Sequence, residues 1–225
     1  MKISYGILCS TELEETKRLV NFLLENKNKN DEIVVVQDMG WPKVMVKPDR
    51  RELWDYLDYL GQEHQNKIKF ENYTFENNFS AIKNYLNSLC TGDYILQLDA
   101  DEEISKTFIN QLHAILDANP NIELFWLPRI NIVNGLTEEH IRMWNWRVTT
   151  HSMTKEKVVN YPDYQGRLYK NLPSKIMWTK PVHERISGAE TFTYFPDHED
   201  YCIHHVKDIK KQEQQNKLYG KIAHG

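Results

Sequence analysis

The sequence lacks a long apolar run and an excess of positive charge, and each absence excludes a class of protein. No window approaches the ~20 apolar residues that a membrane-spanning helix needs. Lysine and arginine number 28 against 32 acidic residues, giving a formal net charge of -4. Nucleic-acid binding relies on a basic surface, which this balance does not favour. We therefore expect no membrane span and no nucleic-acid partner.

Cysteine is also scarce. The three residues, Cys9, Cys90 and Cys202, are odd in number, far apart, and each follows an apolar stretch. This pattern predicts buried thiols in a reducing compartment and not a disulfide framework. The N-terminal segment has no small-residue cleavage site of the secretory kind. We therefore predict a cytoplasmic protein.

Strand and helix patterns alternate over the first 120 residues. Apolar runs typical of strands occupy residues 3–10, 31–38, 67–70 and 93–99, and helical spacing appears at about 11–24, 54–60 and 79–90. Thr11 and Glu14 form a capping-box pattern for the first helix. This alternation predicts an α/β fold whose sheet has right-handed crossovers.

The second half of the chain reads differently. Short strand patterns follow Pro120 in "IELFWLPRINIV", "GRLYK", "KIMW" and "TFTYF", and the last ~20 residues predict a polar surface helix. No linker composition separates the two parts. We predict one domain, residues 1–225, with a nucleotide-binding half (1–120) and an irregular half (121–225).

The segment "GDYILQLDADEEIS", residues 92–105, places a buried-type strand directly before four carboxylates. Ligands of open α/β sheets bind at the carboxyl ends of strands, where Asp38 and Asp99 both fall. If the chain stays extended, Asp99 and Asp101 point the same way and share Mg²⁺ or Mn²⁺. Alternatively, the carboxylates lie at the first turn of a helix beginning at Ser105, where negative charge interacts favourably with the positive end of the helix dipole. We favour that second interpretation for Glu102 and Glu103, and both stay open for Asp99 and Asp101.

Three other carboxylate sites fit poorly. A calcium loop starting at Asp99 needs glycine where Ile104 stands and a bidentate carboxylate where Asn110 stands. An aspartyl-phosphate phosphatase usually has Thr or Val where Glu103 stands. A sugar-phosphate nucleotidyltransferase needs a glycine-rich loop after the first strand, and "LCSTELEE" contains no glycine.

The stretch "NNFSAIKNYLNSLCTGDYILQLDADEEIS" resembles family 2 glycosyltransferases of the GT-A fold. These have an N-F-S-A-x-[RK]-N helix, a T-G-D turn and a strand ending in L-D-A-D-E, in this order. "DEIVVVQD" upstream, and "PVHERI" and "IHHVKDIKKQEQQNKLY" downstream, extend the resemblance. It implies a Rossmann-like GT-A fold, a mixed sheet flanked by helices, in which residues 121–225 form an irregular acceptor side.

The resemblance also implies a donor site. It predicts a nucleotide-sugar donor, with a uridine nucleotide as the first guess, and a divalent cation, Mn²⁺ or Mg²⁺, that neutralises the diphosphate leaving group. The residues implied to bind the nucleotide-sugar are Cys9, Ser10, Thr11, Asp38, Lys83, Asp99 and Ala100, and those implied to bind the metal are Asp101, Asp99 and His205. Lys83 could equally be a solvated helix lysine. Trp41 follows Asp38-Met39-Gly40 where relatives often continue as D-x-G-S-x-D, which leaves the base open.

Acceptor chemistry is assigned to the C-terminal half. The family inverts the anomeric carbon, so a carboxylate must take the acceptor proton, and Glu184 is the leading candidate. If "PVHERI" is a strand, only one of His183 and Glu184 faces the site. His205, or its neighbour His204, is the candidate for reaching the metal. We expect a glycan, lipid-linked or protein acceptor, and no catalytic role for the C-terminal helix.

Tryptophans are concentrated in the same half. Indole faces stack well on sugar rings, so we expect one or two of them to line the acceptor cleft and the others to pack in the core. The candidates are Trp126, Trp144, Trp146 and Trp178. Two rival functions stay open: a non-catalytic nucleotide- or carbohydrate-binding module of the same fold, and a metal-dependent phosphoryl-transfer enzyme with Asp99 or Asp101 as nucleophile.

Overall fold

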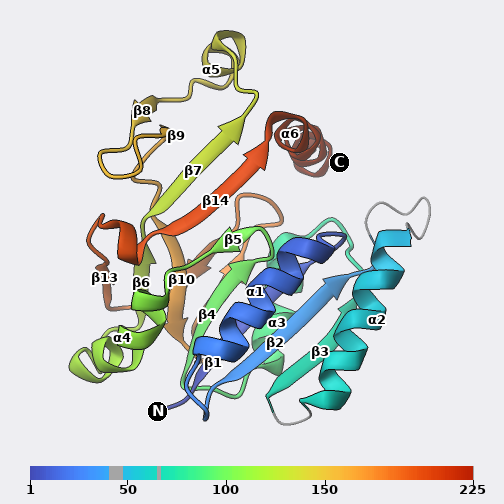
Figure 1. Ribbon diagram of the computed structural model, residues 1–225, viewed down its shortest axis with the longest axis vertical. Coiled ribbons are helices and arrows are strands. Elements are labelled where there is room, and N and C mark those ends of the chain that lie inside the picture. The colour runs from blue at the N-terminus through green and yellow to red at the C-terminus, as the bar shows by residue number, and fades with distance from the viewer. Residues whose placement is uncertain (41–47, 65–66, 225) are drawn as a thin grey trace.

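The computed structural model describes residues 1–40, 48–64 and 67–224, and its centre is a seven-stranded sheet ordered β13-β6-β10-β4-β1-β2-β3 (Figure 1). Four parallel strands form one side of it: β1 (Ile3–Cys9), β2 (Glu32–Asp38), β3 (Ile68–Tyr73) and β4 (Tyr94–Asp99). On the other side, β10 (Gln165–Lys170) runs antiparallel between β4 and β6 (Leu124–Leu127), and β13 (Phe192–Tyr194) adds a parallel edge. The predicted mixed sheet is confirmed.

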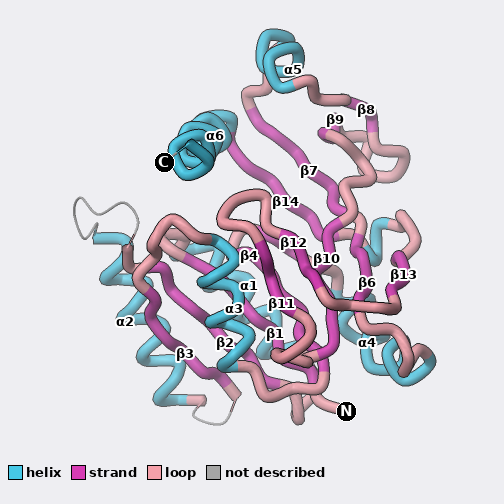
Figure 2. The backbone as a smooth tube through the Cα atoms, turned by 180° about the vertical axis from the view of Figure 1, so that it is seen from behind, coloured by secondary structure: helices cyan, strands magenta, loops and turns pink. Residues whose placement is uncertain are grey.

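Helices cover both faces of this sheet. One face carries α1 (Leu13–Asn26), α2 (Pro48–Glu63) and α4 (Lys106–Ala118); the other carries α3 (Phe79–Leu89) and the hairpin β11 (Met177–Thr179) and β12 (Arg185–Ser187) (Figure 2). Along β2, Ile33 and Val35 pack toward the first layer, whereas Val34 and Val36 pack toward the second. Successive side chains of a strand point to opposite faces, which is why a doubly covered strand is apolar throughout.

A second sheet stands at the carboxyl end of the first. It contains β5 (Glu102–Glu103), β14 (Ile203–Asp208) and β7 (Arg129–Asn134). The chain passes between the sheets at Pro128, which lacks the N–H that a continuous ladder needs. The remaining described elements are α5 (Glu138–Trp144), the hairpin β8 (Val148–Thr150) and β9 (Lys157–Val159), the 3₁₀ helix η1 (Glu199–Tyr201) and α6 (Ile209–His224).

The structure tests the sequence predictions about the first helix cap and the cysteines. The capping box at Thr11 and Glu14 is wrong, because α1 begins at Leu13 with Glu12 as its N-cap and without a side-chain cap. Instead, Glu12 Oε2 accepts from the backbone N–H groups of Ser10 (2.8 Å) and Thr11 (2.9 Å). The prediction of buried free thiols is confirmed for all three cysteines.

The division of the chain near residue 120 stays a prediction, since strands from both sides of it join the central sheet. Trp41, at which the sequence departs from the family pattern, lies outside the described residues. Within the described part of the chain, no helix has the length and apolar character needed to cross a membrane.

Candidate functional site

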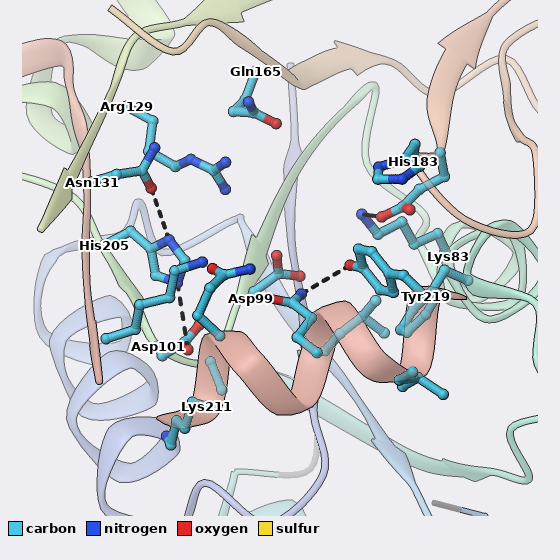
Figure 3. A pocket seen from close by; sticks show the side chains of 18 of the residues that line it. Lys83, Asp99, Asp101, Arg129, Asn131, Gln165, His183, His205, Lys211 and Tyr219 are labelled. Atoms are coloured by element: carbon cyan, nitrogen blue, oxygen red, sulfur yellow. Dashed lines mark hydrogen bonds and ion pairs between the residues drawn. The ribbon is translucent and has the colours of Figure 1, made fainter. Parts of the chain in front are cut away.

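A cleft of about 1380 Å³ opens at the carboxyl ends of β1, β2 and β4 (Figure 3). The second sheet, the loop between β11 and β12, and one side of α6 complete its walls. Typical small-molecule sites occupy ~300–1,000 Å³. The cleft is therefore larger than one ligand of that size requires.

The end of β1 and the end of β2 meet at one side of this cleft. Ser10, Thr11 and Asp38 line it together with Cys9 and Ala100. Arg50 donates from Nη2 to Ser10 Oγ (3.1 Å), and Asp38 Oδ1 accepts from the backbone N–H of Gly40 (2.7 Å). Cys9 itself is 5% exposed, and burial raises the pKa of its thiol far above the ordinary value. Cys9 therefore borders the cleft as an inert thiol.

Asp99 is held by a buried arginine that sequence reasoning missed. Arg167 Nη2, from β10, lies 2.6 Å from Asp99 Oδ2, and Gln97 Nε2 donates to Asp99 Oδ1 (3.1 Å). Burial raises the pKa of the Asp99 carboxyl, but the charges of Arg167 and Lys83 outweigh it and hold the pKa far below its usual range. The Asp99 side chain is still 36% exposed, so a charged face remains toward the cleft.

Glu102 is the second carboxylate of this cluster, and its predicted place in a helix turn is wrong. It lies in β5, is 0% exposed, and its Oε1 accepts from Arg167 (2.8 Å) and Arg129 (3.2 Å). Its Oε2 accepts from the backbone N–H of Asp99 (3.0 Å). The helix α4 does begin after Ser105, whose hydroxyl caps it. Glu103 instead pairs with exposed Arg18 (2.7 Å) on the outer surface.

The expectation of extended chain from Asp99 to Asp101 is also wrong. The strand β4 ends at Asp99, and Ala100 and Asp101 form a turn. Glu102 causes it, because its side chain reaches back to the N–H of Asp99 and closes the loop. Both aspartates nevertheless line the cleft.

Asp101 faces His205 of β14, with Oδ2 and Nε2 3.5 Å apart (Figure 3). Burial raises the pKa of the Asp101 carboxyl, and the hydrogen bond and positive charge of a protonated His205 lower it, so that the pKa lies below its ordinary value. On the other side of the ring, His205 Nδ1 lies 3.0 Å from Asn131 Oδ1. His204 points to the opposite side of β14 and lines a separate, smaller pocket. Of the two histidines, His205 is the one in the cleft.

Asn131 determines which nitrogen of His205 carries the proton. Its Nδ2 donates to Asp163 Oδ2 (2.7 Å), which also lies 2.6 Å from Arg129 Nη2. An ionised carboxylate oxygen can only accept hydrogen bonds, so the amide nitrogen of Asn131 must face Asp163. The amide oxygen must then face His205, and Nδ1 must be its donor. The remaining nitrogen, Nε2, donates to Asp101 only if the ring gains a second proton; a neutral ring directs its lone pair at the carboxylate.

Glu184 and Lys83 meet across 101 residues of sequence at the opposite wall. Lys83 is 5% exposed, donates from Nζ to Glu184 Oε1 (2.5 Å) and lies 4.2 Å from the centroid of the Trp178 ring. The alternative of a solvated lysine is therefore wrong. His183 and Glu184 lie in the loop between β11 and β12, and His183 has a φ of 52°. Because this segment is no strand, both residues line the cleft.

The C-terminal helix forms part of the site, although its sequence indicated only a surface helix. Tyr219 of α6 contacts the rings of Phe79 (5.4 Å) and His183 (5.3 Å), which ties the helix to α3 and the β11–β12 loop. Burial raises the pKa of the Tyr219 hydroxyl to about 12, and the charge of Glu184 adds to it. Lys211, Gln212 and Tyr219 line the cleft.

The four tryptophans do not divide as expected, because Trp178 lines the cleft as well as packing in the core and Trp144 is only half-buried. Trp178 is 5% exposed and belongs to the core, where its Nε1 donates to Tyr169 (3.0 Å). Trp126 and Trp146 line the cleft, and Trp144 packs against Trp146. Among the described residues, no group of three or more His, Cys, Asp or Glu side chains is arranged to hold a metal ion. Asp101 and His205 are a pair only.

Comparison with known proteins gives one family match. The family model described as "Glycosyl transferase family 2" matches residues 6–171. Curated relatives from Rickettsia felis and Rickettsia conorii, both described as uncharacterized glycosyltransferases, are 27% and 25% identical over 123 residues, which is 51% of this chain. The matched segment is 34% of each relative, so it spans about a third of their length.

Solved structures share the fold. S. aureus TarS 1–349 in complex with UDP-GlcNAc has a TM-score of 0.57 at 14% identity, covering 92% of this chain and 59% of that one. The complex of the same protein with UDP gives 0.57 at 12% identity, covering 99% and 65%. The predicted GT-A architecture is confirmed by this likeness, which at such identity shows the fold alone.

The neighbouring residues Glu102 and Glu103 provide a direct test of the buried cluster. We expect Glu102→Gln to lower the free energy of unfolding by about 3 kcal/mol, because Arg129 and Arg167 lose a buried counter-charge. Glu103→Gln removes only an exposed pair and should cost less than about 1 kcal/mol. Urea unfolding followed by circular dichroism measures both, and equal losses would contradict the assignment.

Proposed function

Because the chain belongs to glycosyl transferase family 2, we propose that it transfers a sugar from a uridine diphosphate sugar to an acceptor hydroxyl, with inversion at the anomeric carbon. The observation that carries the proposal is the convergence of Asp101, His205 and Glu184 on one cleft from the turn after β4, from β14 and from the β11–β12 loop. The complexes of TarS with UDP-GlcNAc and UDP support uridine as the base.

The nucleoside binds at the carboxyl ends of β1 and β2. Asp38 and Asp99 are hydrogen-bond acceptors on either side of Ser10 and Thr11, which suits ribose hydroxyls and a base N–H. Lys83 and Arg167 hold Asp99 ionised, so it accepts and does not donate. This arrangement supports Asp99 as a nucleotide-binding residue in the proposal and Asp101 as the main metal ligand.

A divalent cation fits the Asp101 and His205 pair. When Nε2 of His205 carries no proton, this nitrogen and a carboxylate oxygen of Asp101, 3.5 Å apart, direct two electron pairs at one region where a cation would bind both. Mn²⁺ accepts both donor types. Two protein donors leave coordination positions for diphosphate oxygens, as is usual in sites that bind metal with a phosphate substrate. When bound, the ion would supply charge to stabilise the leaving diphosphate.

Glu184 is the base in this proposal. Lys83 occupies its Oε1, and within the described part of the chain Oε2 accepts no hydrogen bond. The acceptor oxygen forms a bond to the anomeric carbon, the bond from that carbon to the diphosphate breaks, and the acceptor proton moves to Glu184 Oε2. Lys83 keeps the carboxylate in position, and its own Nζ lies over the Trp178 ring.

His204 provides a matched control for the metal ligand. We expect His205→Ala to weaken Mn²⁺ binding at least tenfold, because it removes the only nitrogen donor of the pair, whereas His204→Ala should leave it unchanged. Asn131→Leu should weaken it by about 10-fold, because the ring loses the contact that fixes its tautomer. Electron paramagnetic resonance of Mn²⁺ in the presence of UDP measures all three. Equal affinities of the two histidine variants would rule out His205 as a ligand.

Glu184→Gln separates catalysis from binding. Removing a general base costs ~10²–10⁴-fold in rate, so release of UDP from a panel of UDP-sugars should fall by about 10³-fold while UDP affinity stays within about threefold. Glu190→Gln, at a carboxylate on the exposed surface, is the control. A variant that turns over at the wild-type rate would rule out Glu184 as the base, and UDP binding without turnover by either the wild type or the variant would indicate the non-catalytic binding module instead.

A further inference from the structure

We propose that an aromatic surface beside the cleft, formed by Trp126, Tyr164, Phe192 and Tyr194, is a glycan-binding subsite that holds pyranose rings of the acceptor. The inference rests on the proposed function and narrows the acceptor class to carbohydrate. We call these four residues the aromatic platform. They come from β6, β13 and the residue just before β10.

The rings of the platform are grouped around Tyr194. Trp126 lies beside it on the neighbouring strand, with ring centroids 6.1 Å apart and planes 19° apart. Tyr164 and Phe192 meet Tyr194 edge-on, at 4.9 Å and 6.0 Å. Tyr194 is 52% exposed and Phe192 is 57% exposed. Large aromatic side chains are thus left in solvent together, where burial would have been favourable.

The neighbouring strands explain why Trp126 is held at this place. Gly166 of β10 pairs with Trp126, and a Cβ at Gly166 would lie 3.6 Å from the indole ring. Tyr194 pairs with Trp126 on the other side. Because side chains of paired residues stand on the same face of a sheet, the indole is supported between a glycine and a tyrosine.

The platform is continuous with the cleft that contains Glu184. Trp126 and Tyr164 line that cleft, and Tyr194 extends the surface from Trp126 toward the sheet edge. Trp126 also packs against the same buried cluster as Ile186, two residues after Glu184. Figure 2 shows β10, β6 and β13 side by side at one edge of the sheet, near the hairpin of β11 and β12. A chain of sugars on the platform would therefore lead toward Glu184.

The chemistry of the platform suits sugars. The C–H bonds of one pyranose face carry partial positive charge, and aromatic faces are negative. Among the described residues, neither Trp126 Nε1 nor the Tyr194 hydroxyl has a hydrogen-bond partner within the chain, so both can bind sugar hydroxyls. A sugar ring has an apolar face and a rim of hydroxyl groups. The aromatic faces of the platform can contact the first, and Trp126 Nε1 and the Tyr194 hydroxyl can bind the second.

The platform is too small to be a stable contact between two copies of the chain. An aromatic side chain has ~150–250 Å² of surface, so two rings about half exposed offer on the order of 200 Å². A stable protein interface needs ~800 Å² per partner. One or two sugar rings match the available area.

Tyr59 is the matched control for a test, because it is a tyrosine of α2 that is 57% exposed and lies outside the cleft. The variants are Tyr194→Ala, Tyr194→Phe and Tyr59→Ala. The probes are maltotriose, cellotriose and triacetylchitotriose, titrated with UDP and Mn²⁺ present and followed by saturation-transfer nuclear magnetic resonance. UDP affinity is measured on every variant.

We expect at least one trisaccharide to bind the wild type, about tenfold more weakly to Tyr194→Ala, and near normally to Tyr194→Phe and Tyr59→Ala, with UDP affinity unchanged. Equal binding to all variants, or no trisaccharide binding while UDP binds, overturns the subsite alone. A dimer in sedimentation that dissociates in Tyr194→Ala assigns the platform to self-association and also overturns it. Failure of UDP to bind the wild type overturns the proposed function first, and the subsite with it.

Discussion

The cleft depends on one buried arginine held between two carboxylates. The Arg167 side chain is 4% exposed, and its Nη2 lies 2.6 Å from Asp99 and 2.8 Å from Glu102. Burying the charges of Arg167, Asp99 and Glu102 costs free energy, and removing one partner costs more, because it leaves a buried charge unpaired. The geometry of this group is therefore not easily rearranged. Glu102 then closes the turn that carries Asp101. An antiparallel strand from the second half of the chain thereby fixes the acidic end of β4.

The same charges extend to the other wall of the cleft. Arg129 bridges Glu102 and Asp163, and Asp163 orients Asn131, which orients His205 toward Asp101. The two candidate metal ligands thus come from a turn between the sheets and from β14 of the second sheet but share one supporting network. Glu184 is held by Lys83 and lines the same cleft as Trp126 and Tyr164 of the aromatic platform. In the proposed function, donor binding, proton transfer and acceptor binding would take separate places along a single cleft.

Most of the fold and part of the site can be predicted from local sequence patterns. The apolar runs of β1, β2 and β4 and the acidic end of β4 are short-range signals, and they indicated the sheet and the position of Asp99 and Asp101. The role of Glu102 was missed because its partner Arg167 is 65 residues away. A lone arginine inside the apolar strand "GRLYK" was the available signal. The contribution of α6 was missed because polar residues facing a cleft have the same pattern as polar residues facing solvent.

The most direct test of the account is calorimetric titration of UDP and GDP into the protein, with and without Mn²⁺, and into Asp101→Ala. The account predicts that UDP binds, that Mn²⁺ strengthens its binding, and that this gain disappears in Asp101→Ala while the fold is kept. Binding of GDP in place of UDP would change the base and leave the metal site intact. If neither nucleotide binds under any metal condition, the acidic cluster serves the structure alone, and the account of a nucleotide-sugar site is wrong.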